Sequence, residues 1–315
     1  MNFTTKVPIA KSNFPIDYSS QIVALGSCFA ENMGEKFDFN KFQNTTNPFG
    51  IIFNPVSIEK ILERAIHLNY FTETDLFFHN ELWHCYEVHS DLSQPNKEAM
   101  LSNLNRLLTE MNSKLAAATH LFITYGTSWV YQLKASNSVV ANCHKVAQDQ
   151  FEKVIISGTE IENAIQNSID LIQKFNPKCQ VVFTVSPVRH IKDGFVENQR
   201  SKANLISAMH TSISQNPTLS YFPSYEIVMD ELRDYRFYAQ DLLHPNAVAI
   251  DYIWERFCES NITDAAQQVM QEVESIQKGM AHRPFHPDSI SHSKFLQKLK
   301  EKSAQLEAQY PYMKF

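Results

Sequence analysis

The chain has little glycine, little cysteine and no CxxC pair. Only 7 of its 315 residues are glycine and 5 are cysteine. An odd number of cysteines at irregular spacing excludes a disulfide scaffold and a zinc finger, and it favours a reducing compartment. Because glycine is so scarce, each one is expected where the backbone needs a positive φ or comes close to a ligand.

Excess basic charge and membrane-crossing segments are missing as well. The formal net charge is −6, so we expect no nucleic-acid partner. The N-terminal segment lacks the apolar core of a signal peptide. Residues 115–133 contain no charged side chain, but their histidine, glutamine and hydroxyl residues are too polar for a lipid-facing helix. The sequence therefore predicts a cytoplasmic protein without membrane contact.

Apolar residues, in contrast, are plentiful and follow two periodicities. They make up 43% of the chain, which is enough for a full core. Continuous apolar runs at 21–25, 120–125 and 180–185 are typical of buried parallel strands. Shorter strand patterns occur at 42–46 and 219–222. Helical patterns separate and follow the strands, at 29–37, 57–69, 96–117, 159–175, 198–214, 225–233 and 245–260.

This alternation predicts an α/β fold, a three-layer α/β/α sandwich with about five mostly parallel strands. Two hairpin insertions are expected, within 76–89 and 129–140. Residues 1–260 are predicted to form one domain, and 261–315 a helical C-terminal extension that is interrupted by prolines. We expect its charged, amphipathic helices to pack along the body or against a second copy, as in a homodimer.

The first candidate site residue is Ser27, which follows a predicted buried strand and Gly26 and precedes a helix. In open α/β sheets, the carboxyl ends of the strands face the crevice in which ligands bind. Free N–H groups at the start of the helix could stabilise an oxyanion there. Ser27 is therefore either a nucleophile or a simple helix cap.

The second candidate is the segment from Asp241 to His244. A carboxylate three residues before a histidine, in a loop ahead of a helix, can fold back onto the imidazole and orient it. The base that activates a nucleophile requires such a partner. Pro245 is expected as the first residue of the following helix. The alternative is a capping aspartate beside a surface histidine.

Two further turns could supply oxyanion donors. Gly126, Thr127 and Ser128 follow the strand predicted at 120–125, and Gly50 lies in a turn after the strand at 42–46. Each segment is either a plain turn or a source of N–H and hydroxyl donors for the same crevice.

The order of these motifs is similar to the block order of the SGNH/GDSL hydrolases, and the local sequences resemble those of the GSCFA family. The resemblance covers about residues 5–260 and implies a flavodoxin-like strand order. The segments that carry it are GSCFA from Gly26, NPFGIIFNP from Asn47, GTSWVY from Gly126, NCHK from Asn142, TVSPVRH from Thr184, ENQRSKA from Glu197 and YFPSYEIVMDELRDYRFYAQDLLHP from Tyr221.

The resemblance implies a serine esterase that hydrolyses O-acyl esters, such as acetyl esters, of small or carbohydrate-like substrates. It implies no cofactor and no metal. Ser27 would be the nucleophile, His244 the base and Asp241 the group that orients the base. The backbone N–H groups of Ser27 and Gly50 would hold the oxyanion.

One position departs from the superfamily pattern. The third block usually reads Gly-x-Asn, and the asparagine amide contributes to the oxyanion hole; here the segment is Gly126-Thr127-Ser128. Ser128 or Asn142 would then be the third donor. A missing donor of this kind typically costs about 10²–10³ in rate, so the sequence predicts a slow esterase on generic substrates.

Several alternatives stay open at this point. The same triad would serve an O-acyltransferase, and the fold could also be a non-catalytic binding module. Cys28 could replace its neighbour Ser27 as nucleophile, and the chain's twelve histidines could include a zinc site, although no metal-ligand spacing occurs. Arg189 and His190, also at the carboxyl edge, could bind an anionic group or form a loop ion pair.

Overall fold

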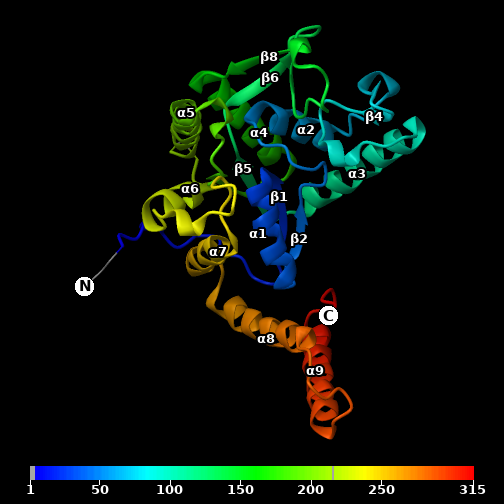
Figure 1. Cartoon of the computed structure of the whole chain (residues 1–315), viewed down its shortest axis with the longest axis vertical. Helices are drawn as coiled ribbons and strands as arrows, with labels where there is room; N and C mark the ends of the chain where they lie inside the picture. The colour runs from blue at the N-terminus through cyan, green and yellow to red at the C-terminus, as the bar shows by residue number, and fades with distance from the viewer. Residues whose placement is uncertain (1–3, 215) are drawn as a thin grey trace.

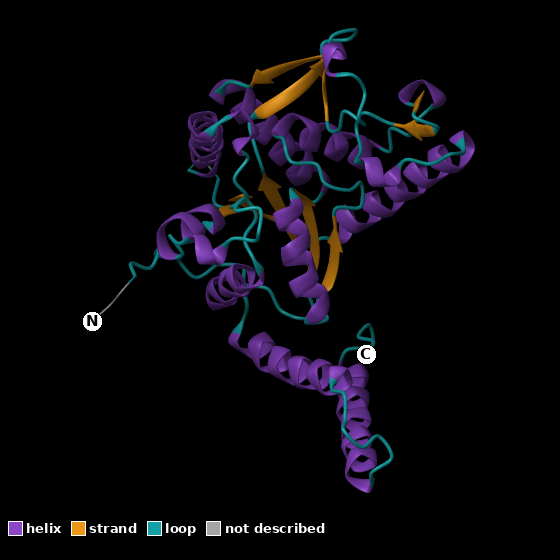
Figure 2. Ribbon diagram, in the orientation of Figure 1, coloured by secondary structure: helices purple, strands orange, loops and turns teal. Residues whose placement is uncertain are grey.

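The computed structural model describes residues 4–214 and 216–315, and at its centre lies a five-stranded parallel sheet (Figures 1 and 2). The strand order β10-β9-β5-β1-β2 is flavodoxin-like. The predicted α/β fold is confirmed, and each strand lies within one residue of its predicted bounds. The strands are β1 (Gln21–Gly26), β2 (Gln43–Thr46), β5 (His120–Tyr125), β9 (Gln180–Val185) and β10 (Leu219–Tyr221).

Helices cover both faces of the sheet. Val23 and Leu25 of β1 pack with α2 to α5, whereas Ile22 and Ala24 pack with α1 and α7. Successive strand side chains point to opposite faces, and both faces are buried, which explains the continuous apolar runs. The helices are α1 (Cys28–Phe39), α2 (Pro55–His67), α3 (Lys97–Ala117), α4 (Gly158–Phe175), α5 (Phe195–Ile213) and α7 (Ala247–Asn261).

Two small antiparallel sheets decorate the body. The predicted hairpins form β3 (Phe77–His79) with β4 (Leu82–His84), and β6 (Trp129–Leu133) with β7 (Ser138–Val140). A strand that was not predicted, β8 (Phe151–Ile155), pairs with the other edge of β6. Single-turn 3₁₀ helices lie in the connecting loops, at Glu73–Asp75, Ser90–Leu92, Gln148–Gln150, Ile191–Asp193 and Tyr235–Phe237.

Two predicted helices differ in their details. The helix expected at 225–233 is a short α6 (Ser224–Glu226) that continues as a π-helical turn (Ile227–Glu231). The prediction that Pro245 is the first residue of α7 is wrong. Asn246 caps α7 by accepting the Ala249 N–H (3.1 Å), because a side-chain amide is a preferred N-cap.

The C-terminal region consists of α8 (Asp264–Ala281) and α9 (Ile290–Gln309), separated by a segment with two prolines. Both helices extend from the body, and the chain end returns toward it (Figure 1). The Tyr312 hydroxyl donates to the Tyr18 carbonyl (2.5 Å), which anchors this end. No helix in the described residues is long and apolar enough to cross a membrane.

The backbone at Gly26, in the centre of the sheet, has no room for a side chain, and a substitution can test this. Its φ is +143°, and a Cβ there would lie 2.2 Å from the Thr124 carbonyl oxygen. Gly26→Ala should therefore lower the free energy of unfolding in urea by at least about 2 kcal/mol. Gly158→Ala is the control, because a Cβ at this first residue of α4 meets nothing within 4 Å. Equal effects of the two substitutions would contradict this account.

Candidate functional site

The carboxyl ends of β1 and β5 meet beneath one loop, residues 47–54. The Ile52 N–H donates to the Gly26 carbonyl (3.1 Å), and the Gly126 N–H donates to the Phe53 carbonyl (2.7 Å). A side chain would not fit at Gly126, because its Cβ would lie 2.9 Å from the Phe53 Cβ. The loop therefore crosses directly over the two strand ends.

Ser27 caps α1 at this edge. Its N–H donates to the Thr124 carbonyl (3.1 Å), and its Oγ accepts the Phe29 N–H (3.3 Å). Ser27 is only 1% exposed. Its hydroxyl thus lies at the predicted strand end, next to the N-terminus of α1.

Asp241 and His244 form a pair. The Asp241 Oδ2 lies 2.6 Å from His244 Nδ1, and Oδ1 accepts the backbone N–H groups of His244 (3.0 Å) and Leu243 (2.9 Å). The two backbone donors and then the imidazole lower the pKa of Asp241 to about 2. The carboxylate therefore stays ionised and fixes the ring, so that Nε2 remains available for a ligand.

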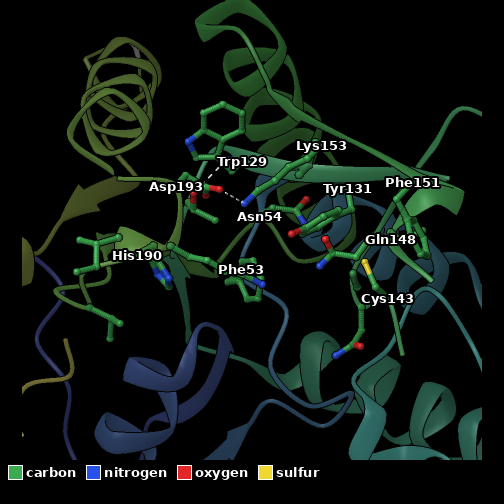
Figure 3. Close-up of a pocket in the computed structure, with 18 of the residues that line it drawn as sticks. Phe53, Asn54, Trp129, Tyr131, Cys143, Gln148, Phe151, Lys153, His190 and Asp193 are labelled. Carbon is green, nitrogen blue, oxygen red and sulfur yellow. Dashed lines mark hydrogen bonds and ion pairs between the residues drawn. The ribbon is translucent and has the colours of Figure 1, made fainter. Parts of the chain in front are cut away.

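The serine and the histidine are not in contact. In residues 4–214 and 216–315, no hydrogen bond joins Ser27 to His244. The His244 side chain is 49% exposed and lines an open cleft, which Ser27 does not. Phe53 and His190 stack at the end of this cleft (ring centroids 6.1 Å apart), as Figure 3 shows. At this sheet edge, Asp241 and His244 of the predicted triad thus form a pair, whereas Ser27 is buried apart from them.

The predicted backbone oxyanion donors are already engaged. The Ser27 N–H is bonded to Thr124, and the Gly50 N–H donates to the Asn47 carbonyl (2.7 Å). Gly50 has a φ of +73°, so the turn itself requires a glycine. In this conformation each of the two N–H groups completes a hydrogen bond within the fold, and their role as oxyanion donors stays a prediction.

Ser128 faces away from the cleft. It is fully buried, its N–H donates to Ser201 Oγ (2.7 Å), and its hydroxyl donates to the Ser201 carbonyl (3.3 Å). Both groups are engaged with α5 in this conformation, and the replacement of the superfamily asparagine by Ser128 stays a prediction. Thr127 and Asn142 do line the cleft. The Asn142 side-chain carbonyl accepts the His144 N–H (2.8 Å), which leaves its NH₂ group as the donor for a ligand.

Sequence reasoning missed Lys202, which is fully buried in α5. Its Nζ donates to the carbonyls of Gly126 (2.7 Å) and Ser186 (2.6 Å), at the ends of β5 and β9. Burial lowers the pKa of Lys202 to about 7. A neutral amine keeps two N–H donors, so both hydrogen bonds survive in either protonation state. The available signal was helical spacing, because Lys202 is in phase with the buried Leu205 and Met209.

From the sequence, His190 was expected, together with Arg189, to bind an anionic group or to form a loop ion pair. Its Nε2 is buried without a hydrogen-bond partner in the described chain. It lies 3.3 Å from where a Cβ would stand on Gly126. Burial, with the charges of Lys202 and His244, lowers the pKa of His190 to about 3, so the ring is neutral at neutral pH. An unpartnered ring nitrogen at this edge is a candidate ligand contact.

The cleft itself has a volume of about 690 Å³. It extends from Phe53 and His190 toward the β6–β8 sheet, where Tyr131 and Phe151 line it (Figure 3). Lys153 of β8 pairs with Asp193 across the cleft wall. The site thus combines a buried serine, an exposed Asp241–His244 pair and a large cleft with aromatic and cationic walls.

The geometry gives little support to the two alternatives, Cys28 as the nucleophile and a zinc site among the histidines. Burial, followed by the charge of Glu31, raises the pKa of the Cys28 thiol, and a thiol needs a lowered pKa to attack as thiolate. His84 and His144 pack ring to ring (4.7 Å between centroids) in an aromatic cluster. In the part of the chain that the structure describes, no three histidine, cysteine or acidic residues gather as a metal site.

A comparison with known protein families shows where this chain belongs. The family model of the GSCFA family matches residues 21–257, three quarters of the chain. The chain belongs to the GSCFA family. A second model, described as the C-terminal domain of GSCFA domain proteins, matches residues 273–315 and so covers α9 and the end of α8. No curated protein is significantly similar to this GSCFA protein. The first match includes every residue of the site described above.

Lys202 gives a pH-dependent prediction. Its pKa is about 7 in the fold and about 10.4 in an unfolded chain, so between these values the unfolded state binds more protons. Stability contributed by this site therefore rises with pH in that window. The difference in unfolding free energy between wild type and Lys202→Met should increase by about 1 kcal/mol per pH unit from neutral to alkaline pH.

The measurement is denaturant unfolding at several pH values. Lys278→Met, at an exposed lysine of α8, is the matched control and should give a difference that does not change with pH. A flat profile for Lys202→Met would mean that the buried amine stays protonated.

Proposed function

We propose that this protein is a serine esterase of the SGNH type that cleaves O-acyl esters of small or carbohydrate-like alcohols. The Asp241–His244 pair carries the proposal. Its 2.6 Å contact builds an oriented base into the sheet edge at which Ser27 caps α1. A base fixed by a carboxylate, near a serine at a helix N-terminus, is the arrangement that acyl transfer needs.

In the proposed reaction, Ser27 Oγ attacks the acyl carbon while its proton passes to His244 Nε2. Collapse of the tetrahedral intermediate breaks the ester C–O bond, and His244 returns the proton to the leaving alcohol. Water then attacks the acyl-serine by the same route and releases the acid. Because Ser27 is buried and the 47–54 loop is bonded to the strand ends beside it, substrate binding must move this loop and bring His244 within reach of the hydroxyl.

The oxyanion donors are reassigned in this proposal. The N–H of Cys28, the first residue of α1, is free of the helical hydrogen-bond pattern. The N–H of the residue after the nucleophile serves this purpose in other hydrolases. His190, with its proton on Nε2, would be the second donor, since this buried atom has no partner among the described residues and lies beside Gly126. His190 would thus take the place of the superfamily asparagine that is absent at Ser128.

The cleft also favours a second candidate, an O-acyltransferase with the same residues. A hydrolase needs room only for its substrate and water, whereas about 690 Å³ beside His244 could also hold an acceptor alcohol. The two activities share the acyl-enzyme step. They are distinguished by whether the acyl group passes to water or to added sugar and alcohol acceptors.

Covalent labelling tests the nucleophile. A serine-directed phosphonate should modify Ser27, as located by mass spectrometry. Labelling should disappear in Ser27→Ala and fall strongly in His244→Ala, because the base is lost, and it should persist in Cys28→Ser. Modification of Cys28, or of neither residue, would contradict the proposal and favour a cysteine nucleophile or a binding module.

A matched pair of substitutions tests the role of His190. His190→Ala removes the donor and should lower kcat about 10²–10³-fold. His190→Gln can place an amide N–H in the same region and should recover part of that loss. Circular dichroism checks that both variants fold. Equal losses in the two folded variants would mean that His190 acts through packing rather than as a donor.

A further inference from the structure

The walls of the cleft carry an excess of positive charge. Its charged lining consists of four cations and one carboxylate, in a chain whose net charge is −6. Asp193 is paired with Lys153. Lys145, Arg189 and Lys192 form no ion pair within the described part of the chain. The cleft beside His244 therefore presents three uncompensated cations, an arrangement that attracts anions.

Arg189 is the one of these cleft-lining cations whose position is fixed by aromatic neighbours. Its guanidinium lies over the rings of Phe195, Tyr238 and Tyr235, at 5.1, 5.7 and 5.8 Å from their centroids. These contacts hold the cation in place without neutralising it. Its backbone N–H donates to the Leu243 carbonyl (3.1 Å), one residue before His244. Arg189 is thus oriented and joined directly to the segment that carries the proposed base.

Polar and aromatic groups complete the lining. Tyr131 and Phe151 offer aromatic surface, and Asn142 and Gln148 offer amides. This mixture suits a sugar, which presents C–H faces and many hydroxyl groups. The volume of about 690 Å³ falls within the range of small-molecule sites.

We propose that the cleft binds an acidic sugar, one that carries a carboxylate or phosphate group, with the anion held by Arg189 and Lys192. The position of the acylated hydroxyl beside His244 rests on the proposed esterase function, but the binding of the acidic sugar does not. A planar guanidinium that meets either anion with two parallel hydrogen bonds explains why a neutral ester would be a poorer substrate.

Calorimetric titration of the full chain measures this binding directly, because the probes carry no acyl ester that the proposed activity could cleave. The probes are glucuronate, glucose 6-phosphate and, as the uncharged reference, glucose. The acidic sugars should bind at least about tenfold more tightly than glucose, and the tighter of the two identifies the anion. Added salt should weaken only the binding of the acidic sugars.

Substitutions assign the binding to the cleft. In the same titration, Arg189→Gln should weaken the binding of the acidic sugars about tenfold or more. Lys192→Gln, at an exposed position, should weaken it to a smaller extent and serves if Arg189→Gln does not fold. Arg200→Gln is the control, because Arg200 pairs with Glu197 and does not line the cleft; it should leave the affinity unchanged.

Absence of binding, equal binding of glucose and the acidic sugars, or affinities unchanged by both cleft substitutions would overturn the inference. The result is separable from the proposed function. A protein that binds acidic sugars but hydrolyses no ester would uphold the cleft assignment and contradict the esterase. A Ser27-dependent esterase that is indifferent to sugar charge would overturn this inference alone.

Discussion

The site depends on one buried amine that joins two strand ends. Lys202 Nζ donates to the carbonyls of Gly126 and Ser186, where β5 and β9 stop. From Gly126, a hydrogen bond reaches Phe53 in the 47–54 loop, which crosses the strand end that leads into Ser27. From Ser186, the chain runs on to the segment whose backbone holds the residue before His244. Lys202 therefore links the loop over the proposed nucleophile with the loop that presents the proposed base.

Electrostatics divide this edge into distinct environments. Backbone donors keep the Asp241 carboxylate ionised, with a pKa of about 2, while burial keeps His190 neutral, with a pKa of about 3. The first can stabilise a protonated His244 during proton transfer, and the second can donate a hydrogen bond without adding a charge to the interior. The cations lie farther out, on the cleft wall, where contact with solvent keeps their desolvation cost low. The same edge can thus combine acid–base chemistry with anion binding.

What could be predicted from sequence was local. β5 and β9 are continuous apolar runs, and their bounds match those expected. The Asp241–His244 contact spans three residues, so the spacing alone predicts it. β8 was missed because two of the five residues of its FEKVI sequence are charged and, in the described part of the chain, it pairs with β6 alone. The Gly50 hydrogen bond lies within a turn that the sequence predicted, whereas the Ser128 hydrogen bond depends on packing against α5, which no local pattern reveals. The roles of Ser27, His244 and Asp241 stay predictions.

The central claim is that Ser27 and His244 act together on one ester group, and a crystal structure of the phosphonate-treated protein tests it most directly. The account predicts phosphorus bonded to Ser27 Oγ, His244 Nε2 within hydrogen-bond distance of the adduct, and the Phe53 side chain displaced from Gly126. An adduct on another residue, or one on Ser27 with His244 still out of reach, would contradict the account.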